Sequence, residues 1–436
     1  MAFLTQKESI TGIEWQELHP DSSYTWLTEG MRHEFSFFLP LGTKETKGSA
    51  PTNVEALFKM YSLGVVTSRD EWVYDFSSSK LEEKIQKFIQ NYNAEVFRLS
   101  QTSIPPRLDK DVLISFVDNF VNRDASFLKW TDRLKESLIK KDVLKLRKSE
   151  IRYALYRPFC KQFLYFDSLL NQRRYQQYLI FPGVETDNIV ICVPGIGNRK
   201  DFGCLATNTI PSLDLAFEKT QTFPYYTYAE DGSNRRENIT DWALAQFRGQ
   251  YGDAVTKWDI FHYIYAMLYH PVYRTRYAEN LKRDLPRIPL LPSREMFALC
   301  VRVGKALMEL HLHYETAQEY RLPHVETKGM QTNWLVKKMK LTPSKDAVIV
   351  NDWLTLTGVP QECFEYRLGN RSALEWVLDQ YQVSRDARSE IESDPNRADD
   401  PQYIVRLVKR VVSVSVETVK LVRELEQGVT LEAVGA

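Results

Sequence analysis

The sequence predicts an α+β protein in which a β-rich half, with a mixed or antiparallel sheet, precedes a mostly helical half. Between about 150 and 230, apolar residues alternate at a period of two and Gly, Pro, Asn and Asp separate short segments, as in strands joined by turns. Before and after this region, apolar residues recur at the 3.6-residue period of helices. A chain of 436 residues has room for two or three domains. We expect a connecting arm over 1–45, a β-rich part with preceding helices over 46–250, and a helical part over 251–436.

The first expected elements are a strand over 72–76 and a helix over 80–98, followed by one or two helices within 109–146. The helix at 80–98 is indicated by Leu81, Ile85 and Phe88, which would share one face. Short strands are expected at 151–157, 163–167, 189–193, 213–217 and 225–229. The C-terminal part should hold a strand at 347–350, helices at 294–314, 372–381 and 403–426, and a charged loop at 384–402.

Composition limits the classes of function. Lys and Arg number 57 and so do Asp and Glu, so a surface for a polyanion has to arise from local segregation of charge. No apolar run reaches the roughly 18 residues of a membrane-spanning helix, and the first residues lack the pattern of a secretory signal. The 5 cysteines are widely spaced and contain no CxxC, which indicates reduced thiols in the cytoplasm.

The stretch from Trp258 to Ser293 organises the helical part. Its first half is apolar on nearly every side, which predicts a buried helix capped by Asp253 or Thr256 and ended by Pro271. Its second half is basic, and a tyrosine recurs in it every four residues, at 269, 273 and 277. A basic, tyrosine-lined segment suits nucleic acid, whereas the alternative is an ordinary helix pair whose arginines are solvated or paired locally.

Basic side chains gather at three further places, in loops of the expected sheet. Loops on a rigid sheet commonly carry recognition groups, and Arg and Asn can make bidentate contacts to base edges. The candidate DNA contacts, with Arg69 as a weaker member, are Arg69, Arg173, Arg174, Arg199, Lys200, Arg235, Arg236, Arg274, Arg276 and Arg287.

Motifs for catalysis or cofactor binding are incomplete. The glycines at 195 and 197 follow a strand but lack the third glycine and the following helix of a nucleotide loop. His311 and His313 lie two apart, so they diverge on a helix and cannot share a metal. Glu326-Thr327-Lys328 has the E-x-K spacing of a nuclease without its upstream aspartate. The residues favour binding over catalysis.

Several separated segments resemble one known family. They lie at 61–77, 156–167, 223–228, 237–244, 257–290, 310–315, 365–383 and 394–412. The chain is similar through them to the C-terminal specificity region of type ISP restriction–modification enzymes, and the first 40 residues or so resemble the end of the preceding methyltransferase part. The sequence departs from the family pattern at Glu390, where the family has glycine.

The resemblance implies that the chain reads a short site in double-stranded DNA and positions an adenine-N6 methyltransferase on it, as part of a bacterial defence system. Nuclease, ATPase and methyltransferase modules would be supplied in cis or on another chain, and this chain would be a truncated protein, a split subunit or a remnant. S-adenosylmethionine, ATP and Mg²⁺ would belong to those modules, so no cofactor or metal is expected here. The alternatives are a methyltransferase fragment that is catalytic only with a partner chain, and a protein-interaction scaffold. No membrane contact is expected.

Overall fold

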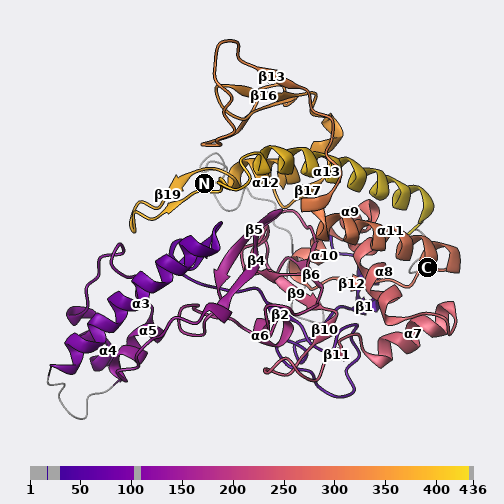
Figure 1. The fold of residues 1–436 in the computed structure, drawn as a ribbon. Coiled ribbons are helices and arrows are strands. Elements are labelled where there is room, and N and C mark those ends of the chain that lie inside the picture. The colour runs from indigo at the N-terminus through magenta and orange to yellow at the C-terminus, as the bar shows by residue number, and fades with distance from the viewer. Residues whose placement is uncertain (1–16, 18–29, 103–109, 432–436) are drawn as a thin grey trace, which may run out of the picture.

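The computed structural model describes residue 17 and residues 30–102 and 110–431, and within them it is a mixed α+β protein. Figure 1 shows a lobe of helices on one side, sheets in the centre, and a group of packed helices on the other side. The lobe contains α3 (Ser78–Ser100), α4 (Lys110–Phe120) and α5 (Asp132–Ile139). The predicted helix at 80–98 is therefore confirmed, with Leu81, Ile85 and Phe88 all buried.

Two four-stranded sheets form the centre. The first has the order β2-β9-β6-β7 and the second has the order β3-β5-β4-β8. The strands of the first sheet are β2 (Ser62–Leu63), β9 (Gln221–Pro224), β6 (Val190–Val193) and β7 (Leu205–Thr207). The strands of the second sheet are β3 (Tyr74–Asp75), β5 (Cys160–Tyr165), β4 (Ile151–Arg157) and β8 (Ile210–Pro211). All pairs are antiparallel except the parallel pair of β4 and β8, so the prediction of a mixed sheet is confirmed.

Of the expected strands, the one at 72–76 is confirmed only in part and the one at 213–217 is wrong. Residues 70–73 form the short helix α2 (Asp70–Val73), which buries Trp72 and leaves only β3 as strand. The segment 213–217 is a loop rather than a strand, and its residues 215–217 are buried. Its backbone follows Ser212, which approaches Gly64 so closely that a Cβ on Gly64 would lie 2.5 Å from the Ser212 carbonyl oxygen. Apolar residues in this loop are buried by a neighbouring chain segment and not by pairing within a sheet.

The buried helix of the Trp258–Ser293 stretch is α8 (Lys257–Tyr269). Thr256 caps it in a capping box with Asp259, and the chain leaves the helical conformation at His270, before Pro271. The basic half forms α9 (Pro271–Arg276), α10 (Ala278–Arg283) and β12 (Arg287–Ile288).

Helices pack closely around α8. It crosses α11 (Arg294–Leu312), while α13 (Tyr403–Gly428) covers α11 and α12 (Ala373–Gln380). At the crossing, a Cβ on Gly304 would lie 2.0 Å from the His262 carbonyl oxygen, so only glycine lets the two backbones approach this closely. One hydrophobic cluster extends from Phe35 to Leu431 and crosses residue 250. The domain boundaries that the sequence suggested at 45 and 250 stay predictions.

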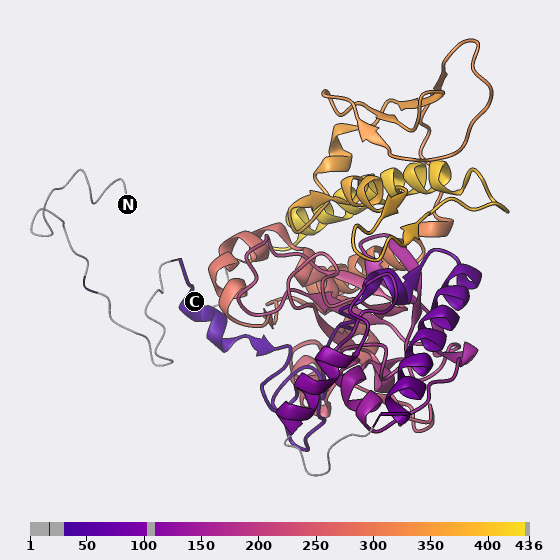
Figure 2. The same ribbon diagram turned by 90° about the vertical axis from the view of Figure 1, so that its left-hand side faces the viewer.

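A third four-stranded sheet stands apart from the centre, with the order β13-β16-β15-β14. It projects beyond α13 in both views (Figures 1 and 2). Its strands are β13 (His324–Glu326), β16 (Leu354–Thr357), β15 (Ala347–Ile349) and β14 (Lys340–Leu341). Cross-strand pairs place Leu354, Leu356 and Val348 on an inner face, where all three are buried.

Smaller elements connect these layers. The charged loop expected at 384–402 contains a hairpin whose turn puts Glu390 in the left-handed region, with φ of +58°. The remaining helices and strands are η2 (His33–Phe37), β1 (Leu39–Pro40), η3 (Lys148–Glu150), α6 (Gln177–Ile180), β10 (Tyr226–Thr227), β11 (Arg236–Glu237), α7 (Asp241–Tyr251), η4 (Tyr314–Thr316), η5 (Gln361–Phe364), β17 (Arg367–Leu368), β18 (Arg371–Ser372), β19 (Ser384–Arg385) and β20 (Glu392–Ser393).

Candidate nucleic-acid interface

The loop that carries Arg173 and Arg174 is fixed by its backbone. Arg173 exchanges two hydrogen bonds of 2.9 Å with the backbone of Val66, which joins the loop to the segment after β2. The Arg173 side chain is exposed and has no ion-pair partner among the described residues. The Arg174 guanidinium instead lies 5.1 Å from the ring of Phe166 and 5.4 Å from that of Tyr178. Arg173 is therefore presented to solvent, while Arg174 is partly held by the protein.

The loop that carries Arg199 and Lys200 is held by Asn198, whose buried amide bonds Lys200 O and Glu218 N. The Arg199 side chain is 85% exposed, yet its Nη2 lies 2.9 Å from Glu218. This ion pair raises the pKa of Arg199 and lowers the pKa of Glu218. Lys200 donates to Ala216 O at 3.2 Å. A phosphate would have to compete with Glu218 for Arg199, because the pair already satisfies much of the guanidinium.

The loop that carries Arg235 and Arg236 is exposed throughout. Arg235 lies 4.7 Å over the ring of Tyr226, and Arg236 donates to the Asn234 side chain at 3.0 Å. Neither has a carboxylate partner among the described residues. The adjoining hollow of about 390 Å³ is lined by Arg235, Tyr228 and several acidic residues, so the local charge is mixed. A cation resting on an aromatic ring is preorganised, because part of its rotamer freedom is already lost.

The cations of the Trp258–Ser293 stretch have structural partners. Arg276 pairs with Glu34 at 2.7 Å, and Arg287 donates to the carbonyl oxygens of Ser36 and Phe38. Both therefore fix the segment 33–40, which packs on α9, β12 and Tyr277. Arg274 donates to Leu268 O at 2.6 Å.

The tyrosines of the same stretch face the core. The predicted shared helix face is wrong, because Tyr269 ends α8, Tyr273 lies in α9 and Tyr277 follows α9. Each of the three is at most 1% exposed, so they do not line a nucleic-acid surface. Their hydroxyls bond Cys204 O, Arg287 O and Glu34. This arrangement is the alternative that the sequence left open, a helix pair with local partners.

Arg69 is fully buried. It donates to Thr131 Oγ1 at 2.7 Å and lies 5.3 Å from the ring of Phe88. Desolvation lowers its pKa to about 10. We therefore leave Arg69 out of the candidate interface, since a side chain with 0% exposure cannot reach a ligand in this conformation.

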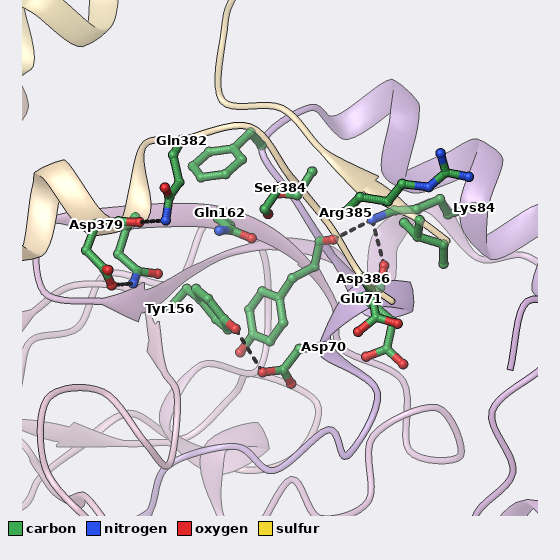
Figure 3. A pocket seen from close by; sticks show the side chains of 15 residues that line it. Asp70, Glu71, Lys84, Tyr156, Gln162, Asp379, Gln382, Ser384, Arg385 and Asp386 are labelled. Carbon is green, nitrogen blue, oxygen red and sulfur yellow. Dashed lines mark hydrogen bonds between the residues drawn. The ribbon is translucent and has the colours of Figure 1, made fainter. Parts of the chain in front are cut away.

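A polar pocket of about 370 Å³ lies where the second sheet meets α2, α3 and the β19–β20 hairpin (Figure 3). Tyr156 donates to Asp70 at 3.0 Å on one side of it. Lys84 on the other side donates to the carbonyl oxygens of Glu71 and Tyr74. Burial lowers the pKa of Lys84, while its ion pair with Asp75 at 2.8 Å opposes that shift. The pocket offers hydrogen-bonding groups to a polar ligand.

A larger groove of about 1130 Å³ adjoins this pocket through Phe76. Its wall combines the first turn of α3, the segment 332–335 and the segment 394–401, and its aromatic side chains include Tyr153 and Phe163. Neither hollow could be predicted from the sequence, because their linings combine residues as far apart as Asp70 and Ser393, or Phe76 and Pro401. The structure marks the groove by Tyr153, a large aromatic residue on β4 that is 54% exposed, and the sequence carries no signal for that exposure.

The described residues contain no group of three or more His, Cys, Asp or Glu that could hold a metal ion. His311 is buried, and both of its ring nitrogens already have hydrogen-bond partners: Nδ1 lies 2.6 Å from the Tyr265 hydroxyl and Nε2 lies 2.9 Å from the Thr418 hydroxyl.

Over the part of the chain that is described, no helix is both long enough and apolar enough to span a bilayer.

Comparison with known proteins assigns this architecture. A family model described as the Type ISP C-terminal specificity domain matches residues 56–407. No curated protein matches the chain. A nuclease-deletion mutant of the Type ISP restriction–modification enzyme LlaGI, in complex with a DNA substrate mimic, superposes with a TM-score of 0.83 and 32% identity over 97% of this chain and 31% of that one.

Two further DNA complexes are similar. The DrdV–DNA complex has a TM-score of 0.82 and 35% identity over 97% of this chain and 41% of that one. The ATP-dependent Type ISP restriction–modification enzyme LlaBIII bound to DNA has a TM-score of 0.82 and 26% identity over 97% of this chain and 26% of that one. The chain thus spans less than half the length of each of these proteins.

Proposed function

Because the chain belongs to the family of Type ISP C-terminal specificity domains, we propose that it recognises a short base sequence in double-stranded DNA. The observation that carries the proposal is the similarity, at 35% identity and over 97% of this chain, to a protein solved as a complex with DNA. Two further similar proteins were also solved with DNA or a DNA substrate mimic.

The exposed loops supply the groups that such recognition needs. Arg173, Arg235 and Arg236 are exposed and have no carboxylate partner among the described residues. Arginine can bond the O6 and N7 atoms of guanine in the major groove, and phosphate contacts fix the register of the protein on the duplex. We assign these three to direct contact, and Arg174, Arg199 and Lys200 to contacts that require release from their present partners.

The second part of the proposal concerns the methyltransferase with which the chain would act. The chain would orient an adenine-N6 methyltransferase, present in cis or on another chain, so that one adenine of the bound site enters its pocket. We place S-adenosylmethionine, ATP and Mg²⁺ on the other modules of the enzyme, because the sequence carries no complete motif for binding them.

Selection of bound duplexes from a random pool tests the proposal. After several rounds of capture on the immobilised chain, we expect the pool to converge on one short asymmetric sequence. A pool that stays random while the chain is folded would contradict sequence recognition. Arg173→Ala and Arg235→Ala, carried through the same rounds, would show which positions of the enriched site each side chain reads.

A further inference from the structure

The segment 321–340 concentrates positive charge in a chain whose formal charge is zero. Of its 20 residues, 5 are Lys or Arg and only Glu326 is acidic. The cations are Arg321, Lys328, Lys337, Lys338 and Lys340, and all are exposed. None of them has an ion pair or a side-chain hydrogen bond with the residues that the structure describes. Some exposed lysines elsewhere do find partners, such as Lys282 with Glu279 at 2.6 Å and Lys345 with Glu375 at 2.9 Å.

The backbone of this segment is fixed although its cations are free. The Asn396 side chain bonds both the N–H and the carbonyl oxygen of Val336 at 2.9 Å. Asn351 donates to the carbonyl oxygens of Asn333 and Leu335, and Val383 N donates to Lys337 O. Held in this way, the segment buries Val336 and Met339 and points Lys337, Lys338 and Lys340 to solvent. Like charges are thus kept close together without compensation, which favours an anionic ligand.

The same segment borders the groove of about 1130 Å³ through residues 332–335. Lys80 and Arg397 add positive charge to the lining. Its acidic residues are Glu82, which pairs with Lys148 at 2.8 Å, Asp394, which accepts two hydrogen bonds from Asn396, and Asp399. The lining itself is therefore of mixed charge, and the excess of positive charge lies on the segment 321–340.

The aromatic part of the lining is partly accessible, with Tyr153 exposed and Phe163 and Trp334 half-buried. The rings of Tyr153 and Phe163 lie 4.4 Å apart, and Tyr153 is 54% exposed. Trp334 adds a third ring, whose indole N–H has no partner among the described residues. Cations beside exposed aromatic rings suit a nucleic acid better than a small inorganic anion, because rings contact sugars and bases while cations contact phosphates.

We propose that segment 321–340 and the adjoining groove form a second, sequence-independent contact to DNA, in which Lys337, Lys338 and Lys340 neutralise phosphates flanking the recognised bases. This inference rests on the proposed function for the identity of the ligand, but it makes a separate prediction. The contact should supply affinity and salt dependence without supplying sequence preference, because phosphates carry no sequence information directly. A protein partner on this surface is the competing possibility.

The test compares two triple variants of the full chain. The first is Lys337→Gln, Lys338→Gln and Lys340→Gln. The matched control is Lys140→Gln, Lys141→Gln and Lys145→Gln, which removes the same charge from lysines that are also exposed and without ion pairs. Dissociation constants are measured by fluorescence anisotropy at several salt concentrations, with the enriched duplex and with a scrambled duplex of the same length.

We expect the first variant to lower the salt slope for both duplexes by about 2.7, at about 0.9 for each lost phosphate contact. Over a fourfold rise in salt, the parent chain then loses about 40-fold more affinity than the variant does. The ratio of affinities for the two duplexes should stay unchanged, and the control should keep the parent slope.

Three results would overturn the inference. An unchanged slope in the first variant would show that these lysines do not touch phosphate, and equal losses in both variants would reduce the effect to net charge. A loss confined to the enriched duplex would mean that the lysines read bases. Failure of the proposed function is seen separately, because the parent chain would then bind both duplexes alike or neither.

Discussion

Gly304→Ala tests the packing that supports the candidate interface. The substituted Cβ would lie 2.0 Å from the His262 carbonyl oxygen, 2.8 Å from the His262 carbonyl carbon and 3.2 Å from the Ala266 Cβ. A comfortable C···O contact is about 3.3 Å, so α8 and α11 would have to separate by roughly 1.3 Å. A gap of about 0.5–1 Å already forfeits a quarter to a half of the dispersion energy of each contact across it.

The magnitude follows from two opposing effects. Overpacking of this kind costs about 1–3 kcal/mol, and the backbone clash places Gly304→Ala at the upper end. Replacing glycine by alanine inside a helix returns about 0.5–1 kcal/mol. We therefore expect a net loss of about 2 kcal/mol in the free energy of unfolding, measured by urea denaturation.

A matched control separates these effects. Gly249 lies in α7, is exposed, and has no atom within 4 Å of the position of an added Cβ. Gly249→Ala should therefore stabilise the protein by about 0.5–1 kcal/mol, because only the higher helix propensity of alanine acts at this position. A Gly304→Ala variant as stable as the parent chain or Gly249→Ala would refute the close crossing of α8 and α11.

Three further predictions concern single side chains. Glu390→Gly should stabilise the protein by about 1 kcal/mol in urea denaturation, because a φ of +58° costs other residues about that much; a loss of stability would contradict the turn. Burial lowers the pKa of His311 from 6.5 to about 3, so the unfolded chain binds the proton first and stability falls as pH drops below about 6.5. His311→Gln should reduce the dependence of the urea midpoint on pH between about 4.5 and 6.5, with the remainder coming from His262 and His270, whose pKa values burial also lowers. An unchanged slope would show that His311 does not contribute. Arg235→Ala should weaken specific duplex binding by about 1–3 kcal/mol in fluorescence anisotropy if it reads a base, whereas a uniform loss on all duplexes would assign it to phosphate.

Long amphipathic helices were predictable because their apolar period of 3.6 records burial on one face. The sequence places α3, α11 and α13 within a few residues of their ends for this reason. Residues 213–217 were wrongly predicted to be a strand, because a loop can also bury apolar residues and has no regular period by which to recognise it.

The candidate site was harder to predict than the fold. The four-residue spacing predicted that Tyr269, Tyr273 and Tyr277 share one helix face, but the helix ends at His270 and all three side chains are buried. Whether a basic side chain is free or ion-paired depends on residues far away in the chain. Arg276, for example, pairs with Glu34, which lies 242 positions earlier. The groove beside 332–335 is assembled from separate segments, so only the folded chain reveals it.

The most direct test of the central claim is the dissociation constant of the enriched duplex and of a series of its single-base-pair variants, at one salt concentration near 150 mM. If the chain reads DNA sequence, each changed pair within a short continuous site should weaken binding by about 1–3 kcal/mol, and changes outside the site should have no effect. Equal dissociation constants across the whole series would contradict the proposed function.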